Sequence, residues 1–425
     1  MILLSFHKNF VFCCFNTRVL HAIVFLVFGF VSQAIAQEAQ QEIEPLSVTG
    51  IHRPSLVSLD ELMTAFMLEH EVPGASLAVS KDGVIVYSRG FGWRDVQRRL
   101  PVKPSTRFRI ASLSKPITSA AIASLVKAGK INFDDSLLSF LTVSERALVH
   151  PRLRSVTIEQ ILLHRGGWDR SISGDPMFET IKIGEALGLG RPANQNELIQ
   201  FVLKRAPDFE PGTGYAYSNF GYCLLGRIIE RVTNQSYGDF VKSTLFKCPL
   251  EGSLDLGQTL TQQKNETKYY VPSKRLVPGV VTGVLGQRVP TQYGGWCIEN
   301  MDSHGGWIAS AEGLVTFADS FNRPDLCEFL TKSIVSEIFK NPMGDDKNVY
   351  YGYGWLVRRV GGDGRRNTWH NGSLPGTSTL LVRRHDGINW AVLFNTRDGK
   401  NGKSLSSLID PLIHQAVNRV DEWPN

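Results

Sequence analysis

The chain has 425 residues, of which 42% are hydrophobic and 20% are charged. This composition is typical of globular proteins and excludes a disordered, collagen-like or multi-span membrane chain. The formal net charge is +6, and basic residues occur mainly as isolated doublets such as Arg98-Arg99. A nucleic-acid-binding protein needs a clustered basic stripe, so we expect no nucleic-acid partner. A second interpretation is that some doublets in the C-terminal strands contact an anionic substrate.

The first 36 residues have the pattern of a secretory signal peptide. Lys8 and Arg18 precede an apolar run over residues 22–31, and small residues follow ahead of Gln37. The apolar run is about half of the roughly 20 residues that span a bilayer. We therefore expect a cleaved leader over residues 1–36 and an exported protein, periplasmic or secreted. An uncleaved membrane anchor is the alternative.

Residues 37–425 contain four cysteines: Cys223, Cys248, Cys297 and Cys327. In an oxidising compartment four cysteines allow three disulfide pairings, and the sequence does not choose among them. Cys223 lies in an apolar helical stretch, which favours a buried thiol. The spacings lack the close Cys-x-x-Cys pairs of a zinc site. We expect no metal and no other cofactor.

The segment after the leader predicts a linker followed by a helix. Residues 37–57 are polar and contain proline, which is typical of a linker. The sequence from Ser58 to Glu61 has the pattern of a capping box, which predicts that an amphipathic helix begins there and runs to about Glu71.

Strand patterns lie at both ends of the chain, and helical patterns lie between them. Alternating apolar segments flank an Asp-Gly pair at residues 82–83 and again at 386–387, which predicts two β-hairpins. We predict an α+β fold in one domain, residues 58–425, whose terminal hairpins form one antiparallel sheet flanked by helices. A mostly helical lobe is expected over about residues 120–340, with a cleft between lobe and sheet.

The first candidate for chemistry is the sequence SLSK that begins at Ser112. Ser112 and Lys115 would share one helix face, and Pro116 keeps the start of that helix close to the serine. A serine becomes a nucleophile when a base removes its proton, and a lysine that has lost its charge is a suitable base. The same spacing recurs at Ser124, where it is structural, so the alternative is a helix-capping serine beside a surface lysine.

The second candidate is the loop sequence GYAYSNFGY, which contains Tyr217 and Asn219. A phenol acts as a base only when nearby positive charge holds it as a phenolate, and Lys115 is the candidate source of that charge. The Asn219 amide offers donors and an acceptor for a substrate amide. The alternative is that Asn219 caps the following helix while Tyr217 packs in the loop.

The third candidate is the sequence HNGS at the end of a strand that is expected to line the cleft, with His370, Gly372 and Ser373. The pattern His-x-Gly occurs three more times, in loops and in a hairpin turn, at His164, His304 and His385. Only His370 precedes a strand after both other motifs. The glycine would allow a substrate backbone to approach the strand edge.

Together the three motifs resemble those of the serine β-lactamase-like family, which includes penicillin-binding proteins, D-alanyl-D-alanine carboxypeptidases, class C β-lactamases and related esterases. The similarity runs from about Leu56 to Asn395 and includes TRFRIASLSKPIT, EPGTGYAYSNFGY and HNGSLPGTSTLLVRR. Each motif is weak alone, but their order and spacing are specific. The resemblance implies a β-lactamase/transpeptidase-like fold.

The resemblance also implies acyl transfer. Ser112 would be the acylated nucleophile and Lys115 its activating partner. Tyr217 would be the proton shuttle that serves the leaving group and helps deacylation. Water would then release the acyl group from the enzyme.

The same resemblance assigns substrate-binding roles. Asn219 would bind a substrate amide, and the backbone N–H groups of Ser112 and Ser373 would form an oxyanion hole. His370 and Gly372 would lie on the strand that aligns the substrate. Class C β-lactamases have a lysine where this chain has His370, and a neutral imidazole holds a carboxylate less strongly than an ammonium group. This departure lowers the expectation of efficient β-lactam hydrolysis.

We therefore expect an exported serine hydrolase that acts on an amide or ester, with D-alanyl peptides or related small molecules as favoured substrates and peptidoglycan or β-lactams as candidate ligands. A carboxylesterase on the same scaffold is one alternative, although no Gly-x-Ser-x-Gly sequence of an α/β-hydrolase occurs. A non-catalytic protein that binds penicillin or peptidoglycan is another, although a binder needs no activated hydroxyl.

Overall fold

The computed structural model describes residues 46–247, 250, 252–273, 276–362 and 364–424. The expected signal peptide and residues 37–45 of the expected linker lie outside the described residues. No helix in these ranges is both long enough and apolar enough to cross a bilayer.

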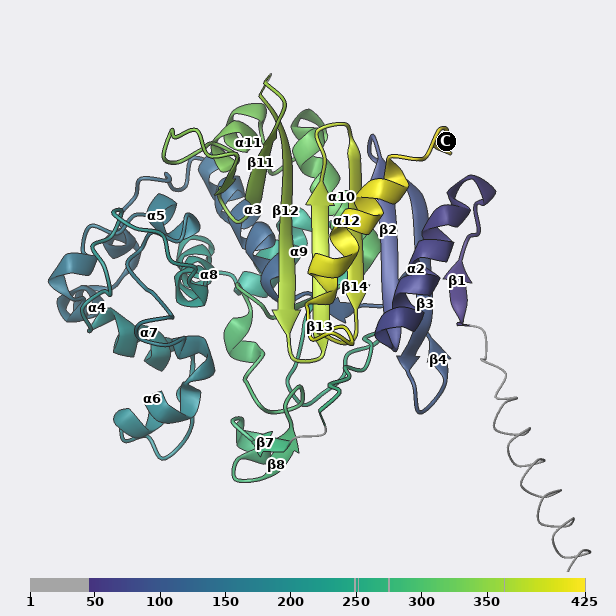
Figure 1. Ribbon diagram of the computed structural model, residues 1–425. Coiled ribbons are helices and arrows are strands. Elements are labelled where there is room, and N and C mark those ends of the chain that lie inside the picture. Colours follow the sequence, from purple (N-terminus) through teal and green to yellow (C-terminus); the bar gives the residue numbers. More distant parts are fainter. Residues whose placement is uncertain (1–45, 248–249, 251, 274–275, 363, 425) are drawn as a thin grey trace, which may run out of the picture. The chain divides into compact units, whose positions relative to one another are not determined.

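A nine-stranded antiparallel sheet is the main β element (Figure 1). In spatial order its strands are β1 (Val48–Gly50), β3 (Val84–Asp95), β2 (Gly74–Lys81), β14 (Ile388–Phe394), β13 (Thr377–Arg383), β12 (Arg365–Leu374), β11 (Leu356–Val360) and β10 (Val349–Tyr351), and β4 (Leu100–Pro101) pairs with β3. β2 pairs with β14 from Ala75 opposite Phe394 to Lys81 opposite Ile388. Both ends of the chain therefore contribute to one sheet, as the sequence predicts.

The two predicted hairpins form and their turns lie side by side. Asp82 and Gly83 both have positive φ, 51° and 85°, which matches the twist of the flanking strands β2 and β3. The Asp82 amide donates a hydrogen bond of 2.9 Å to the Gly387 carbonyl in the other turn. The join between the chain ends thus extends to the tips of both hairpins.

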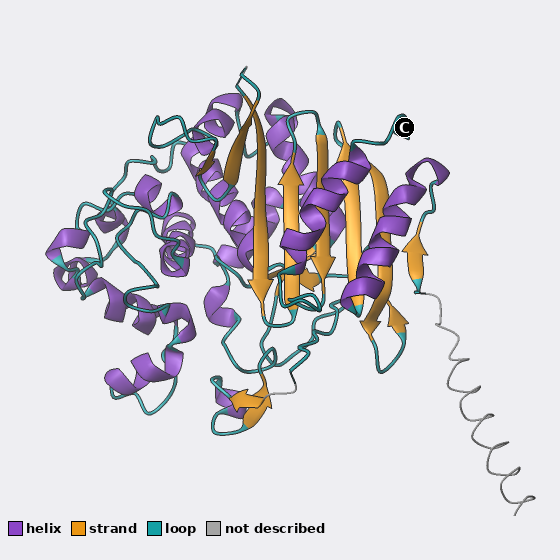
Figure 2. Cartoon of the chain, in the orientation of Figure 1, coloured by secondary structure: helices purple, strands orange, loops and turns teal. Residues whose placement is uncertain are grey.

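Helices cover both faces of the sheet (Figures 1 and 2). α2 (Val57–His70) packs with α12 (Leu405–Val417) on one face, and α10 (Ala311–Asn322) packs against β2 and β14 on the other. Every residue of β14 and nearly every residue of β2 is buried. Continuous apolar strands are typical of a sheet that is covered on both faces.

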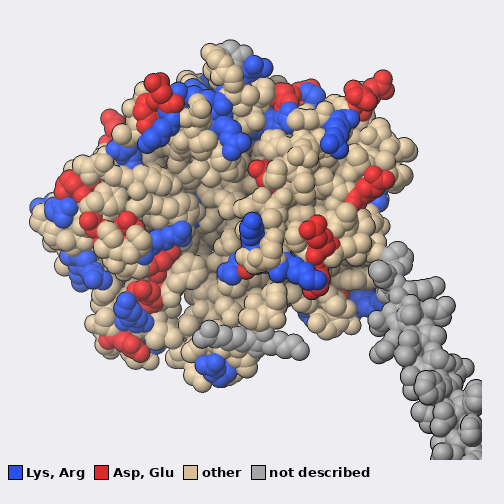
Figure 3. All heavy atoms as spheres, in the orientation of Figure 1, with Lys and Arg blue, Asp and Glu red and all other residues tan. Residues whose placement is uncertain are grey.

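A helical region lies beside the sheet. α3 (Ser114–Lys127), α8 (Asn219–Thr233) and α9 (Tyr237–Leu245) pack on one another, and α3 is buried from Ser114 to Leu125. The remaining helices are α4 (Val143–Leu148), α5 (Ile158–Leu162), α6 (Thr180–Ala186), α7 (Gln195–Leu203) and α11 (Lys332–Ile338). Basic and acidic side chains are interspersed on the face that Figure 3 shows.

The predicted lobe over residues 120–340 contains short strands that the sequence did not predict. β6 (Leu254–Leu256) and β9 (Trp307–Ala309) form a small sheet with β5 (Phe108–Arg109), and β7 (Leu276–Pro278) pairs with β8 (Arg288–Pro290). Strands of three residues are too short to show an alternating pattern.

The start of the domain differs from the sequence prediction in two respects. Residues 48–50, which the sequence places in the linker, form strand β1 and pair with β3. α2 begins at Val57 with Leu56 as its N-cap, and no side chain caps the helix. The predicted capping box from Ser58 to Glu61 is therefore wrong. Burial of Leu59 and Met63 against the sheet stabilises this helix instead.

Candidate active site

Ser112 lies in a short 3₁₀ helix, Ala111–Leu113, that leads directly into α3. From residue 106 to residue 125, Ser112 is the one residue that is not buried. Ala111 has a φ of 48°, a left-handed conformation that costs a non-glycine residue about 1–2 kcal/mol. The strained turn leaves Ser112 partly exposed while both neighbouring residues stay in the core.

Lys115 is fully buried one turn further along, in α3. Its Nζ lies 3.3 Å from Ser112 Oγ, 2.7 Å from Asn219 Oδ1 and 3.0 Å from the His304 carbonyl oxygen. The predicted pairing of serine and lysine on one helix face is therefore present. The alternative, a helix-capping serine beside a surface lysine, is wrong because Lys115 is buried.

The surroundings of Lys115 favour the neutral amine. Burial lowers its pKa well below the usual value; Asp175 opposes this shift, and Arg170 adds to it. A neutral amine has two N–H donors and one lone pair. Since Asn219 Oδ1 and the His304 carbonyl only accept hydrogen bonds, they occupy the two donors. The lone pair is then left for the Ser112 hydroxyl.

Tyr217 and Asn219 flank the N-terminus of α8. The residue between them, Ser218, is the N-cap, and its hydroxyl accepts a hydrogen bond of 3.2 Å from the Gly221 amide. The cap fixes the direction of both neighbours, so the capping role expected as the alternative for Asn219 belongs to Ser218.

Tyr217 lies against Lys115, with the lysine Nζ 4.6 Å from the phenol ring centroid. Burial raises the pKa of Tyr217, while Ser112, as a side-chain hydrogen-bond partner, and Arg170 lower it. The upward shift dominates because the phenolate would be desolvated. The expectation that Lys115 holds Tyr217 as a phenolate is therefore not supported, because Lys115 itself favours the neutral form.

Asp175 completes a hydrogen-bonded chain that the sequence did not reveal. Asn219 Nδ2 donates a hydrogen bond of 2.6 Å to Asp175 Oδ2, while Asn219 Oδ1 accepts from Lys115. Both ends of the Asn219 amide are thus engaged, and one Nδ2 hydrogen remains for a substrate. Burial raises the pKa of Asp175, against the effect of its hydrogen bond from Asn219. The aspartate lies in a loop without a periodic pattern.

His370 lies on β12 and is 2% exposed. Its Nδ1 lies 2.7 Å from the Asn371 carbonyl oxygen, which can only accept, so Nδ1 carries the proton. Nε2 then accepts from the Tyr351 hydroxyl at 3.0 Å. Burial lowers the pKa of His370 to about 3, and Lys115 contributes to the shift. The imidazole is neutral and both of its nitrogens are occupied within the protein.

Gly372 and Ser373 lie on the part of β12 that extends past the end of β11. Residues 370–374 pair with β13, and the pairing of β12 with β11 ends at Trp369. A Cβ atom at Gly372 would lie 2.1 Å from the Ile110 carbonyl oxygen. The glycine therefore lets β12 approach the segment that carries the nucleophile. The sequence analysis had instead predicted that the missing side chain makes room for a substrate backbone. Ser373 is exposed at this end of the strand.

The structure brings two further histidines to the site that the sequence analysis placed in loops. His164 accepts a hydrogen bond of 3.1 Å from the Ser218 amide, and its ring lies 4.4 Å from that of Tyr217. His304 supplies the carbonyl that binds Lys115. Burial lowers the pKa of both imidazoles well below their usual value. Their His-x-Gly patterns are too common in loops to have identified them.

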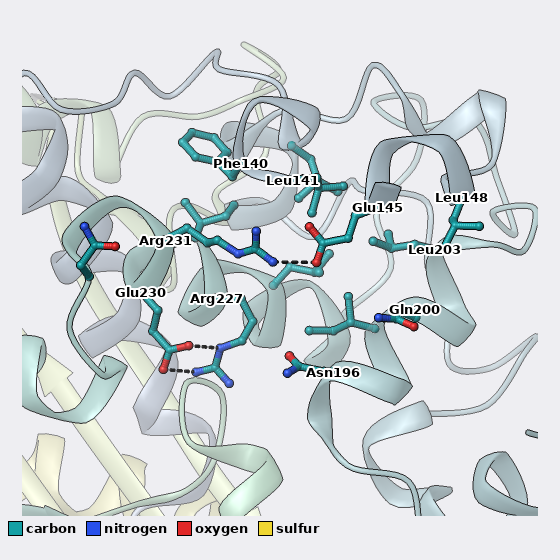
Figure 4. Close-up of a pocket in the computed structure, with 15 residues that line it drawn as sticks. Phe140, Leu141, Glu145, Leu148, Asn196, Gln200, Leu203, Arg227, Glu230 and Arg231 are labelled. Atoms are coloured by element: carbon teal, nitrogen blue, oxygen red, sulfur yellow. Dashed lines mark hydrogen bonds and ion pairs between the residues drawn. The ribbon is translucent and has the colours of Figure 1, made fainter. Parts of the chain in front are cut away.

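A separate pocket of about 390 Å³ opens between α4, α7 and α8 (Figure 4). Its arginines are paired, Arg227 with Glu230 and Arg231 with Glu145. None of the predicted site residues lines this pocket.

The described cysteines form no disulfide with one another. Cys223, Cys297 and Cys327 are free, and Cys248 lies outside the described residues. Across the described ranges, no three His, Cys, Asp or Glu side chains are grouped so that they could hold a metal ion.

The fold and the site define an α+β protein with a surface serine at the start of a buried helix and a buried amine against it. The Beta-lactamase family model matches residues 59–410 of the chain. Since this match covers most of the sequence, the chain belongs to the Beta-lactamase family.

Individual relatives are distant. Penicillin-binding protein 4* of Bacillus subtilis (strain 168) is 26% identical over 336 residues, and the match covers 75% of this chain and 66% of that protein. The chain thus spans just under two thirds of the length of that relative. The octameric penicillin-binding protein homologue from Pyrococcus abyssi has a TM-score of 0.64 at 25% identity, over 87% of this chain and 79% of that chain. The D-amino acid amidase from Ochrobactrum anthropi SV3, also at TM-score 0.64, is 21% identical over 85% of this chain and 99% of that chain, which shows a shared fold.

Proposed function

We propose that this protein is a serine hydrolase that cleaves an amide or ester through an acyl-enzyme on Ser112, with D-alanyl peptides or related small molecules as favoured substrates. The observation that carries the proposal is the position of Lys115. Its fully buried amine lies 3.3 Å from Ser112 Oγ, and the other two atoms that bind it, Asn219 Oδ1 and the His304 carbonyl oxygen, can only accept hydrogen bonds. Burying an amine costs free energy. A serine and lysine with only a structural role would not need to bear this cost.

In the proposed cycle Lys115 takes the Ser112 proton as Oγ attacks the substrate carbonyl. The Tyr217 phenol, which burial keeps protonated, gives a proton to the departing nitrogen or oxygen and recovers one from Lys115. The backbone N–H groups of Ser112 and Ser373 are the proposed oxyanion donors. Water then attacks the acyl-enzyme with the neutral amine of Lys115 as its base.

The substrate class is supported by family membership. The name of one relative records penicillin binding for that protein, which supports penicillins as acylating ligands of this chain. His370 is buried and neutral. It therefore offers no positive charge to a β-lactam carboxylate at the position where class C β-lactamases have a lysine. We therefore propose slow rather than efficient β-lactam turnover.

The experiment is intact-mass analysis after incubation with benzylpenicillin, N-acetyl-D-alanyl-D-alanine and a short-chain p-nitrophenyl ester. We expect an added acyl mass on the wild-type protein with at least one of these compounds, and none on Ser112→Ala. Ser124→Ala is the matched control, because Ser124 has the same Ser-x-x-Lys spacing in the same helix and donates only to the Ala121 carbonyl. Acylation that persists in Ser112→Ala would refute the proposal.

Export is also proposed. The mature protein would begin at Gln37, which the N-terminal sequence of protein recovered from the medium or periplasm would test; recovery of residues 1–36 on a membrane-bound protein would favour the anchor.

A further inference from the structure

Arg170 lies at the edge of the site on the turn that follows α5. Its guanidinium carbon is 5.0 Å from the ring centroid of Tyr217, and the residue is exposed. It lines a small pocket with Asp175 and Asn219, two members of the hydrogen-bonded chain to Lys115. An exposed arginine thus faces the residue that is proposed to serve the leaving group.

The charge of Arg170 lowers the pKa of the Asp169 and Asp175 carboxylates, but neither of them binds it directly. Arg170 forms no hydrogen bond or ion pair within the described ranges, whereas the carboxylates around it have other partners. Asp175 accepts from Asn219 and from the Met177 amide. Glu179 accepts from Lys182, and Asp208 accepts from the Asp169 amide and the Ser173 hydroxyl. The guanidinium therefore keeps its five donors available for a ligand.

The turn that carries Arg170 is held in place on both sides. The Asp169 amide donates to Asp208 at 2.7 Å, and Ser173 Oγ donates to the same carboxylate at 2.7 Å. Asp169 in turn accepts from the Ser171 amide at 2.8 Å. The backbone of this exposed residue is therefore fixed before any ligand binds, which lowers the entropy cost of binding.

Burial disfavours the charged form of the other basic groups of the site. Burial lowers the pKa of Lys115, His164 and His370. An arginine remains charged at all working pH values. Arg170 is thus the persistent cation against Tyr217, and His370, which the sequence analysis considered as a carboxylate partner, is not available for that role.

We propose that Arg170 binds a carboxylate of the substrate and so selects acidic amides or esters over neutral ones. The inference rests on the proposed function and adds the substrate class to it. A guanidinium binds a carboxylate through two parallel hydrogen bonds, which fixes its orientation as well as its charge. Because Tyr217 serves the leaving group, a carboxylate on the leaving side of the scissile bond is the form that Arg170 reaches most directly.

The test measures a specificity ratio. For the wild type and Arg170→Gln, kcat/KM is determined on N-acetyl-D-alanyl-D-alanine and on its C-terminal amide, and on p-nitrophenyl hydrogen succinate and p-nitrophenyl butyrate. We expect the variant to lower the acid-to-neutral ratio of the peptide pair, whose carboxylate is on the leaving side, by roughly 10-fold to 100-fold, mainly through KM. The ester pair carries its carboxylate on the acyl side, so its ratio should change less. Arg170→Lys should recover part of the ratio, because it keeps the charge and loses the two-pronged geometry.

Arg205→Gln is the matched control, since Arg205 lines the same pocket but lies over Phe201, which is not part of the site. A loss of similar size in Arg205→Gln would indicate diffuse charge and would overturn the proposal. So would an unchanged ratio in the peptide pair for Arg170→Gln.

A binding measurement separates this inference from the proposed function. Ser112→Ala cannot turn the substrate over, so calorimetry on this variant measures binding alone. The affinities for N-acetyl-D-alanyl-D-alanine and for its amide are compared with and without Arg170→Gln. Preferential binding of the acid that depends on Arg170 supports the inference even if no acyl-enzyme forms. Equal binding of acid and amide by a protein whose wild type does form an acyl-enzyme would refute the inference and leave the proposed function intact.

Discussion

At the residue scale, the buried amine of Lys115 depends on partners that hold it without neutralising it. No described carboxylate forms an ion pair with it. Asp175 raises its pKa by its charge and binds the Asn219 amide, which in turn binds Lys115. The aspartate fixes which end of that amide faces Lys115, because Nδ2 must point toward the carboxylate. We describe Asp175 as a positioning residue.

Replacing Asp175 by asparagine tests this role. Acylation requires neutral Lys115, so its rate rises with pH through the pKa of the lysine. The Asp175 carboxylate raises that pKa, and its removal should move the acidic limb of the acylation profile to lower pH. Loss of the charge-assisted hydrogen bond to Asn219 should also lower the plateau rate by about 10-fold.

Stopped-flow acylation by a chromogenic substrate over a pH series measures both effects. Glu179→Gln is the control, because Glu179 lines the same pocket but pairs with Lys182 rather than with Asn219. A profile for Asp175→Asn whose acidic limb lies at the wild-type pH, or at higher pH, would contradict the positioning role.

At the element scale, the site depends on how closely β12 approaches the 3₁₀ helix that carries Ser112. Thr379 on β13 donates a hydrogen bond of 3.0 Å to the Ile110 carbonyl, and Thr377 donates one of 2.8 Å to the Arg109 carbonyl. A side chain at Gly372 would meet that same Ile110 oxygen. Threonine side chains of β13 and the close approach at Gly372 of β12 thus hold the sheet against the segment that carries the nucleophile.

Gly372→Ala should therefore separate β12 from the serine. The added methyl group would lie 2.1 Å from the Ile110 carbonyl oxygen and 2.3 Å from Thr379 Oγ1, so the backbone must shift. We expect a loss of about 1–3 kcal/mol in the free energy of unfolding, with a larger proportional loss in acylation rate. Urea denaturation and acylation kinetics measure the two quantities.

Gly362→Ala on the turn between β11 and β12 provides the comparison, because a Cβ there meets no atom within 4 Å. Equal changes in the free energy of unfolding and in the acylation rate for both alanine variants would show that the close approach at Gly372 does not contribute to either.

At the scale of the whole molecule, the sequence predicts what local patterns encode. The Asp-Gly pairs at 82–83 and 386–387 identify two hairpins, and the joined sheet follows from them. Ser112 and Lys115 are three residues apart, on a 3₁₀ helix and on the helix α3 that directly follows it, so their contact is also local. Asp175 and Asn219 are 44 residues apart, and Lys115 and the His304 carbonyl are 189 apart. Those contacts come from loops without periodicity, and only tertiary packing brings them together.

The packing of the helical region beside the sheet also buries three neutral imidazoles, His164, His304 and His370. Burial lowers the pKa of each in the folded protein. In the unfolded chain a histidine binds a proton below its usual pKa of 6.5. The unfolded state therefore binds more protons than the folded state between this value and the lowered one. It follows that each imidazole stabilises the fold less as the pH falls through this window.

His370→Gln isolates one of these groups, since its folded pKa of about 3 gives a window from pH 6.5 down to 3. Within this window we expect the stability of the wild type relative to the variant to fall by about 1.4 kcal/mol per pH unit. Shifts of buried carboxylates cancel in the difference. Urea denaturation at about pH 7.5, 6 and 5 measures it. His52→Gln, at an exposed position, corrects for removing any histidine. Curves for the wild type and His370→Gln that stay parallel over this range would show that His370 is not held neutral by the fold.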